Sequence, residues 1–194
     1  MPGSWGYLRP HTRDYLIKNF PPESTVLDIG AGDNTYHRLL GDYFTTMDAV
    51  EIWEPYVTAY KLRENYRNVY VMDIMDFEFD WYDIIIMGDT LEHLSAENGR
   101  ILIERLAKKC KELVVIVPFN LPQDGIYDPG SESYCPYEAH LQPDLNFETM
   151  PERYPQLELL NMDPSWGMVD NKCHVIINAG EAVYYLCVYV KKQQ

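Results

Sequence analysis

The chain has 194 residues, 46% of them hydrophobic and 24% charged, and its 16 Lys and Arg against 30 Asp and Glu give a formal net charge of −14. This composition excludes an intrinsically disordered chain, and the length predicts a single domain, residues 1–194, with a full hydrophobic core. The negative charge disfavours nucleic acid as a partner, because nucleic-acid affinity comes mainly from Lys and Arg at phosphates.

Cysteine usage and hydropathy bear on the compartment. No apolar run approaches the roughly 20 residues of a membrane helix, and residues 1–20 lack the apolar block of a signal peptide. The four cysteines form no C-x-x-C pair: Cys110, Cys135, Cys173 and Cys187. We therefore expect a cytoplasmic protein without disulfides and without a membrane partner. The oligomeric state is not indicated by the sequence.

Helices and strands are expected to alternate along the first two thirds of the chain. Residues 1–22 predict an N-terminal helical segment that ends at Pro21–Pro22. Helices are also expected from residue 35, after Pro55, and after Ser95, where Ile101, Leu102, Leu106 and Ala107 give the apolar face. Short apolar runs predict five strands, at residues 25–29, 45–51, 69–72, 82–87 and 113–117, the last closed by Pro118.

The last third is organised differently. Residues 119–150 have no clear period and are rich in Pro, Gly, Asp and Tyr, which is typical of a long functional loop. Residues 157–160 and 182–190 predict two more strands with no clear helix between them, and therefore an antiparallel strand near one edge. The whole pattern predicts an α/β fold of three layers, with helices on both faces of a mostly parallel sheet.

In such sheets the ligand lies beyond the carboxyl ends of the strands. The first of these ends carries Gly30 and Gly32, which permit close backbone approach to a ligand. A dinucleotide fingerprint would need a further glycine at position 35, where the chain has Thr35. Because Asp28 and Asp33 would repel a pyrophosphate, a cofactor with a positive charge and no phosphate fits better.

Acidic residues follow the next strands as well. Glu51 stands at a spacing from Asp28 at which an acid can accept hydrogen bonds from both hydroxyls of a ribose. Asp73 follows the third strand and can face an adenine amino group, although an Asp in this position is also a common turn residue. Two acids and an imidazole, Asp89, Glu92 and His93, follow the fourth strand.

Four segments in this order resemble the successive motifs of class I S-adenosylmethionine-dependent methyltransferases: VLDIGAG (26–32), AVEIW (49–53), VMDIMDF (71–77) and DIIIMGDTLEHL (83–94). The resemblance covers residues 24–118 well and the remainder loosely. It departs from the family at Asn34, where a third glycine is common, but Asn also tolerates the left-handed conformation.

The resemblance implies a Rossmann-like sheet of seven strands in the order 3-2-1-4-5-7-6, with the seventh antiparallel. It also implies S-adenosylmethionine as the cofactor, S-adenosylhomocysteine as its product, and a set of residues in contact with the cofactor. These residues are Asp28, Gly30 and Gly32 for the methionine part, Glu51 for the ribose, Asp73 and Ile74 for the adenine, and Asp89 near the amino-acid end, with Ile52 as a further cofactor-binding residue.

Methyl transfer is an in-line displacement that depends chiefly on orientation, so the family resemblance does not require a universal catalytic residue. If the acceptor is a hydroxyl or a protonated amine, a base is needed, and Asp89, His93 and His140 are the candidates. LEHL (91–94) together with His140 resembles ubiquinone-biosynthesis-type and related small-molecule methyltransferases. This leading interpretation includes no metal.

Two alternatives use the same fold. Asp89, Glu92, His93 and His140 resemble the metal site of plant-type small-RNA 2′-O-methyltransferases, although Asp89 is shorter than the Glu found there. Residues 119–152 oppose RNA, because they contain seven acids and no Lys or Arg. The second alternative is a non-catalytic interaction protein that keeps the fold.

Residues 119–150 are the expected lid over the acceptor, and their acids favour a neutral or cationic small molecule, or a basic peptide. Residues 5–9 are a possible second lid, over the cofactor.

Overall fold

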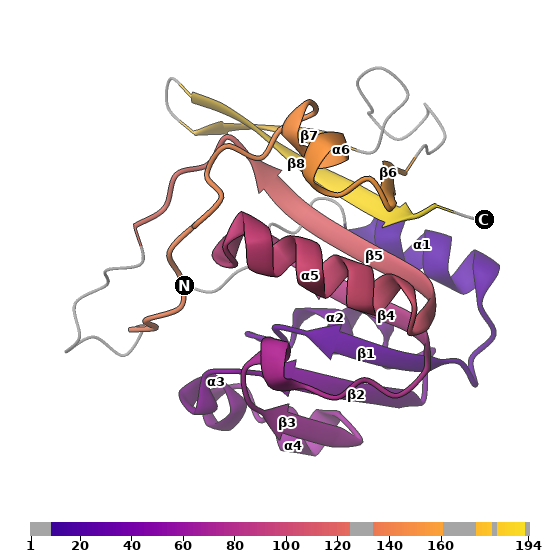
Figure 1. Ribbon diagram of the computed structural model, residues 1–194. Coiled ribbons are helices and arrows are strands. Elements are labelled where there is room, and N and C mark those ends of the chain that lie inside the picture. Colours follow the sequence, from indigo (N-terminus) through magenta and orange to yellow (C-terminus); the bar gives the residue numbers. More distant parts are fainter. Residues whose placement is uncertain (1–8, 125–133, 161–173, 180–181, 193–194) are drawn as a thin grey trace.

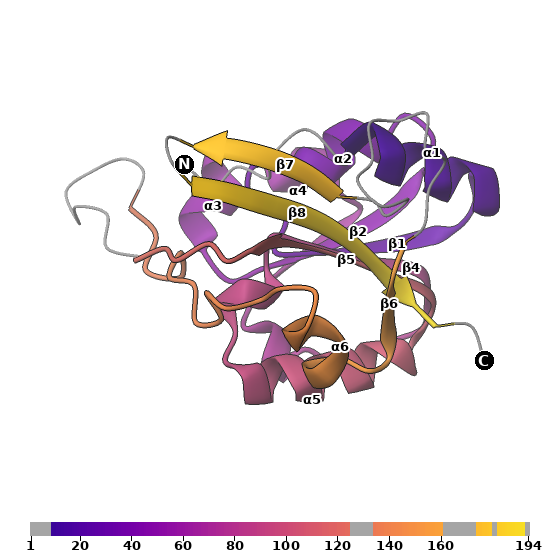
Figure 2. The ribbon, with the colours of Figure 1, turned by 90° about the horizontal axis from the view of Figure 1, so that it is seen from above.

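The structure is a computed structural model that describes residues 9–124, 134–160, 174–179 and 182–192. The strands in these residues form one mixed sheet that lies between two layers of helices (Figure 1, Figure 2). The strands are β1 (Thr25–Ile29), β2 (Thr46–Glu51), β3 (Asn68–Val71), β4 (Tyr82–Gly88), β5 (Cys110–Phe119), β6 (Leu157–Leu159), β7 (His174–Ala179) and β8 (Ala182–Lys191).

The order of the strands confirms the topology expected from the sequence. The sheet runs β3-β2-β1-β4-β5-β8-β6, in which β1 to β5 are parallel and β8 is antiparallel to β5. The strand expected as the seventh is therefore β8. An eighth strand, β7, was not predicted; it pairs antiparallel with β8 on the edge that β6 also uses. The β-branched run at residues 175–177 was a signal for it.

Helices cover both faces of the sheet. Figure 2 shows α1 and α2 on one side and α5 and α6 on the other, and the two hydrophobic clusters of the core follow the same division. The helices are α1 (Arg9–Asn19), α2 (Thr35–Leu40), α3 (Glu54–Ala59), α4 (Leu62–Asn65), α5 (Ala96–Ala107) and α6 (Thr149–Arg153), with the short 3-10 helices η2 (Ile74–Asp76) and η3 (Leu91–His93). None of the helices in the described ranges has the length and apolar character needed to cross a membrane.

The central strand β4 shows why its sequence is apolar at every position. Ile84 and Ile86 pack into the cluster under α1, α2, α3 and α4, whereas Ile85 and Met87 pack into the cluster under α5 and α6. Side chains alternate between the two faces of a strand, and β4 has a helical layer on each face. The expected two-sided burial is confirmed.

Helix α5 begins as predicted but presents a different face. The Ser95 hydroxyl accepts a hydrogen bond from the Asn98 amide (3.2 Å), which is the N-cap expected from the sequence. The buried side chains are Leu102, Ile103 and Leu106, whereas Ile101 is 37% exposed. The inclusion of Ile101 in the apolar face was therefore wrong, and a shift of the helical stripe by one residue explains the error.

Strand β5 continues past Pro118, where the sequence predicted its end. On one side β5 pairs with β4 only as far as Ile116, and beyond it Pro118 pairs with Leu186 of β8. Since Pro lacks an N–H group, it is tolerated where only one neighbouring strand needs hydrogen bonds. Residues 5–8 of the proposed N-terminal lid and residues 125–133 of the acceptor lid lie outside the described residues.

Candidate active site

A cavity of about 790 Å³ opens at the carboxyl ends of the parallel strands. Its wall is made largely by the segments that follow β1, β2, β3, β4 and β5, which is where ligands bind in such sheets. The structure brings nine of the ten residues singled out from the sequence to this wall: Gly30, Gly32, Glu51, Ile52, Asp73, Ile74, Asp89, His93 and His140. Their roles in binding and catalysis stay predictions.

The loop after β1 needs residues that adopt positive φ angles. Gly30 has φ +71°, and a Cβ atom there would lie 2.3 Å from the Thr90 hydroxyl. Gly32 has φ +46° and more space, its virtual Cβ lying 3.6 Å from the Gly30 carbonyl oxygen. Asn34 has φ 67° and precedes α2 in the left-handed conformation. Asn thus takes the conformation for which a third glycine is common in the family.

Glu51 ties this glycine loop to the end of β2. One carboxylate oxygen accepts a hydrogen bond from the Gly32 amide (2.9 Å) and the other from the Trp53 amide (2.8 Å). The residue is only 5% exposed. Burial raises the pKa of its carboxyl group, and the hydrogen bonds from the Trp53 and Gly32 amides oppose that rise. The acid is therefore fixed in one position at the cavity wall.

Asp28 is the predicted site residue that does not line the cavity. It lies on the same face of β1 as Val26, under the layer of α1 to α4, and its carboxylate accepts a hydrogen bond from the Tyr66 hydroxyl. The residue is fully buried, and burial raises the pKa of its carboxyl group to about 7. The two-residue period of a strand turns it away from the ligand side, so any influence on a cofactor passes through the loop that follows.

Asp73 combines the two roles that the sequence left open. Its carboxylate accepts a hydrogen bond from the Met75 amide (2.8 Å), which caps the short helix η2. The same residue and its neighbour Ile74 line the cavity. The turn therefore presents an acid and an apolar side chain to a ligand in a fixed arrangement.

The cavity wall is strongly acidic. In the part of the chain that the structure describes, no Lys or Arg lines it. Six acidic residues do so: Asp33, Glu51, Asp73, Asp89, Glu92 and Glu138. Such a wall attracts a cation and opposes a phosphate-bearing cofactor. A ligand with a sulfonium and an ammonium group complements the charge of this wall. The two loop glycines, which lack Cβ atoms, let such a ligand approach the backbone.

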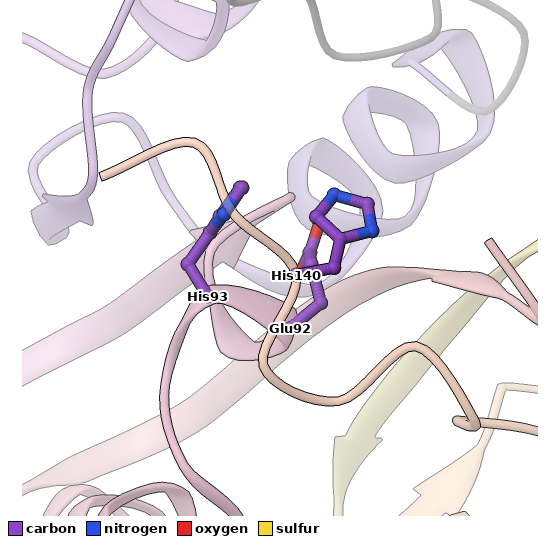
Figure 3. A group of neighbouring side chains, drawn as sticks. All are labelled: Glu92, His93 and His140. Carbon is purple, nitrogen blue, oxygen red and sulfur yellow. The ribbon is translucent and has the colours of Figure 1, made fainter. Parts of the chain in front are cut away.

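A cluster of three side chains, Glu92, His93 and His140, occupies another part of the wall (Figure 3). His93 Nδ1 lies 3.1 Å from the Ala139 carbonyl oxygen, and His140 Nδ1 lies 2.6 Å from that of Leu121. Burial lowers the pKa of both imidazoles, and in His93 the neighbouring His140 lowers it further. The lowered pKa favours the neutral form of both rings.

Glu92 is 1% exposed, and burial, followed by the charge of Asp89, raises the pKa of its carboxyl group well above the usual value. The histidine cluster, as we call Glu92, His93 and His140, thus combines a buried acid with two neutral imidazoles. Among the residues that the structure describes, these are the three whose ligand atoms come together, all within 4.8 Å of one another.

Aromatic side chains join the loop that contains His140 to the cofactor side of the cavity. Trp53 contacts Tyr134 and Tyr137 edge to face, with ring centroids 6.2 and 5.9 Å apart. The Tyr56 hydroxyl donates a hydrogen bond to Glu138 (3.0 Å). The described part of the acceptor lid is therefore packed against α3 and the turn before it.

Sequence reasoning missed several wall residues. Thr90 packs against Gly30, its hydroxyl donating to the carbonyl oxygens of Ile29 and Gly88 (both 3.1 Å). Tyr56 and Cys135 also line the cavity. A Thr after the fourth strand and a Tyr in the third helix have no distinctive spacing, so only the folded chain reveals them.

Comparisons with known proteins agree with this architecture. Residues 27–114 match a family model described as a methyltransferase domain. A search of curated protein sequences finds no match.

Solved structures of similar fold include a magnesium protoporphyrin IX methyltransferase from Synechocystis PCC 6803 with bound SAH (S-adenosylhomocysteine), at a TM-score of 0.61 and 15% identity over 95% of this chain and 82% of that one. A S-adenosylmethionine-dependent methyltransferase from Clostridium acetobutylicum ATCC 824 has a TM-score of 0.65 and 10% identity over 98% and 92% of the two chains. The N-methyltransferase NodS from Bradyrhizobium japonicum WM9 has a TM-score of 0.58 and 12% identity over 97% and 98%.

These findings confirm the resemblance found in the sequence. The chain has the fold of the class I S-adenosylmethionine-dependent methyltransferases, and its residues 27–114 match the model of a methyltransferase domain. The Synechocystis enzyme has been crystallised with S-adenosylmethionine as well as with S-adenosylhomocysteine, the cofactor and product expected from the sequence. The finer resemblance to ubiquinone-biosynthesis enzymes and the cytoplasmic location stay predictions.

Proposed function

We propose that this protein binds S-adenosylmethionine in the 790 Å³ cavity and transfers its methyl group to a small neutral or cationic acceptor. The observation that carries the proposal is the acidic wall at the carboxyl ends of the strands of a methyltransferase fold, to which the described residues contribute six acids and no Lys or Arg. When bound, the cofactor supplies an activated methyl group on a sulfonium.

The glycine loop and Glu51 are the proposed contacts of the cofactor. Gly30 and Gly32 allow the backbone to approach the methionine part, and the carboxylate of Glu51 accepts from the ribose hydroxyls. Each oxygen of Glu51 already accepts one backbone amide, and a carboxylate oxygen can accept two hydrogen bonds. The carboxylate can therefore accept hydrogen bonds from ribose hydroxyls in addition to those from the backbone. Asp73 and Ile74 border the adenine.

The residues of this chain are proposed to orient the acceptor and to receive the proton that it releases. Methyl transfer to a hydroxyl breaks a carbon–sulfur bond, forms an oxygen–carbon bond and releases one proton. Asp89, His93 and His140 are the cavity groups proposed to act on that acceptor. The Nδ1 atom of each imidazole faces a backbone carbonyl oxygen, which holds both rings in place at the cavity wall.

The acceptor is proposed to be small and not anionic. Glu138 and Asp89 lie on the cavity wall, and the described lid residues bring Tyr137 to it. Aromatic and acidic groups together favour a neutral or cationic molecule over a phosphorylated one. The acids of residues 119–152 also argue against an RNA acceptor.

Calorimetry tests the cofactor part of this proposal. We expect S-adenosylmethionine to bind with micromolar affinity and NAD to show no binding at the same concentrations, because a pyrophosphate meets the acidic wall. Binding of NAD, or no binding of S-adenosylmethionine, contradicts the proposal.

A transfer assay tests the acceptor part. The protein is incubated with methyl-labelled S-adenosylmethionine and an extract that has been divided into small-molecule, protein and RNA fractions. Label in the small-molecule fraction supports the proposal, and label in RNA refutes the proposed acceptor class. Cofactor binding without transfer to any fraction favours the non-catalytic alternative.

A further inference from the structure

The histidine cluster is held together by the backbone. The Glu92 carbonyl oxygen accepts hydrogen bonds from the amides of Leu141 (2.8 Å) and Gln142 (3.1 Å), and the Gln142 side chain donates to the Leu91 carbonyl oxygen (2.9 Å). These bonds fix the segment that carries His140 against η3, which carries Glu92 and His93. Figure 3 shows the three side chains coming from these two segments.

The two imidazoles are oriented in the way that metal ligands are. Each Nδ1 is directed at a backbone carbonyl oxygen, that of Ala139 for His93 and that of Leu121 for His140. A metal-ligating histidine almost always donates its other ring N–H to such an acceptor, which fixes the tautomer and the plane of the ring. The rings of His93 and His140 meet at a centroid distance of 4.9 Å, and one ring nitrogen of each lies within 4.8 Å of the other and of a Glu92 oxygen.

Glu92 supplies the second, independent observation. Its side chain is fully buried, and its Oε2 atom has no hydrogen-bond partner among the described residues. A buried carboxyl oxygen without a partner is costly in either protonation state, because nothing replaces the water that it has lost. A cation between Glu92 and the two imidazoles removes this cost.

We infer that Glu92, His93 and His140 bind one divalent first-row transition-metal ion in the cavity. Two imidazole nitrogens and one carboxylate oxygen suit zinc, manganese or cobalt better than magnesium or calcium, which prefer oxygen ligands alone. Ligand atoms about 2.1 Å from a tetrahedral ion lie about 3.4 Å apart, so atoms now within 4.8 Å need only a small approach. Three protein ligands leave a position open to a fourth.

The inference adds a metal ion to the proposed methyl-transfer site, and the effect of that ion on the acceptor rests on the proposed function. An ion at this place polarises an oxygen atom of the acceptor and lowers the pKa of its hydroxyl group. It thereby favours acceptors that present a hydroxyl oxygen. The leading interpretation of the sequence included no metal. We propose one here because the structure brings the three side chains together.

Metal content and optical spectroscopy test the site without any assay of activity. The untagged protein is freed of metal, loaded with Zn²⁺ and analysed for bound metal, and Co²⁺ is titrated as an optical probe. We expect one ion per chain in the wild type. Glu92→Gln, His93→Gln and His140→Gln should each weaken binding by at least about 100-fold, since each removes a direct ligand.

Matched controls distinguish these ligands from other groups of the same kind. His37→Gln and Glu104→Gln change residues outside the cavity wall and should keep one ion per chain. Unchanged binding in the three cluster variants overturns the inference, as does no binding of Zn²⁺, Mn²⁺ or Co²⁺ by the wild type. An intense thiolate charge-transfer band with Co²⁺ also overturns it, because it assigns the ion to a cysteine such as Cys135.

Calorimetry with S-adenosylmethionine separates this inference from the proposed function. Cofactor binding that persists in metal-free protein and in all three variants leaves the function standing, whatever the metal result. If the wild type does not bind S-adenosylmethionine, the proposed function is contradicted, whereas the metal content still tests the proposed metal site.

Discussion

Glu51 offers the sharpest test of how the cavity holds a cofactor. In the structure its two oxygens each accept one backbone amide, from Gly32 (2.9 Å) and from Trp53 (2.8 Å). The substitution Glu51→Gln keeps the size of the side chain and replaces one accepting oxygen by an NH₂ group. That group faces a backbone donor and has no lone pair for a ribose hydroxyl.

The magnitude follows from the bonds that are lost. One hydrogen bond from a ribose hydroxyl to a charged acceptor contributes about 1.5–3 kcal/mol, and each 1.4 kcal/mol corresponds to a factor of ten in affinity. We therefore expect Glu51→Gln to weaken S-adenosylmethionine binding by about 10- to 150-fold, measured by isothermal titration calorimetry. The lost amide contact should also lower the free energy of unfolding, by about 1–3 kcal/mol.

The control is Glu54→Gln, which changes an exposed acid three residues away that is paired with Arg63 at 3.4 Å. It should bind the cofactor like the wild type, because exposed ion pairs contribute little. If Glu51→Gln remains folded by circular dichroism and binds within two-fold of the wild type, the assignment of Glu51 to the ribose is refuted.

Three further outcomes concern the stability of the loop and of the strand before it. In urea titrations, Gly30→Ala should reduce the free energy of unfolding by more than Gly32→Ala. Both residues have positive φ, but only at position 30 does a Cβ atom lie 2.3 Å from the Thr90 hydroxyl. Equal losses of stability contradict this close approach. Asp28 has its pKa raised to about 7 by burial, so the folded state retains a proton between about pH 4 and 7 that the unfolded state has released. The wild type should therefore lose stability relative to Asp28→Asn as the pH rises through this window, by up to about 4 kcal/mol, and a constant difference from pH 4 to pH 8 contradicts the burial argument. Tyr66→Phe removes the hydrogen bond that stabilises the charged form, so it should extend the pH-dependent loss to higher pH in the same titrations.

Much of the sheet could be predicted from the sequence because its signals are local. The apolar run of β4 reflects a strand covered on both faces, and Ser95 caps α5 through its own side chain. The placement of Asp28 could not be predicted in the same way. It follows from the face on which a strand residue lies, and that depends on which helical layer covers the strand.

The histidine cluster marks the other limit of prediction. His140 is 47 positions beyond His93, and their contact depends on backbone hydrogen bonds between η3 and residues 139–142. A resemblance to a metal site named the residues, but no local pattern fixes the direction of their ring nitrogens. The extension of β5 through Pro118 was missed for a similar reason, since it depends on β4 ending first.

The acidic wall acts differently on the two forms of the cofactor. A methyl donor arrives with a positive sulfur and departs as an uncharged thioether, whereas the wall stays negative throughout. Contact with one methyl group is worth only about 0.8 kcal/mol, so electrostatics rather than shape sets the preference between the two forms. If the cavity binds the donor as proposed, we expect it to bind the spent cofactor more weakly, which titration with both compounds would show.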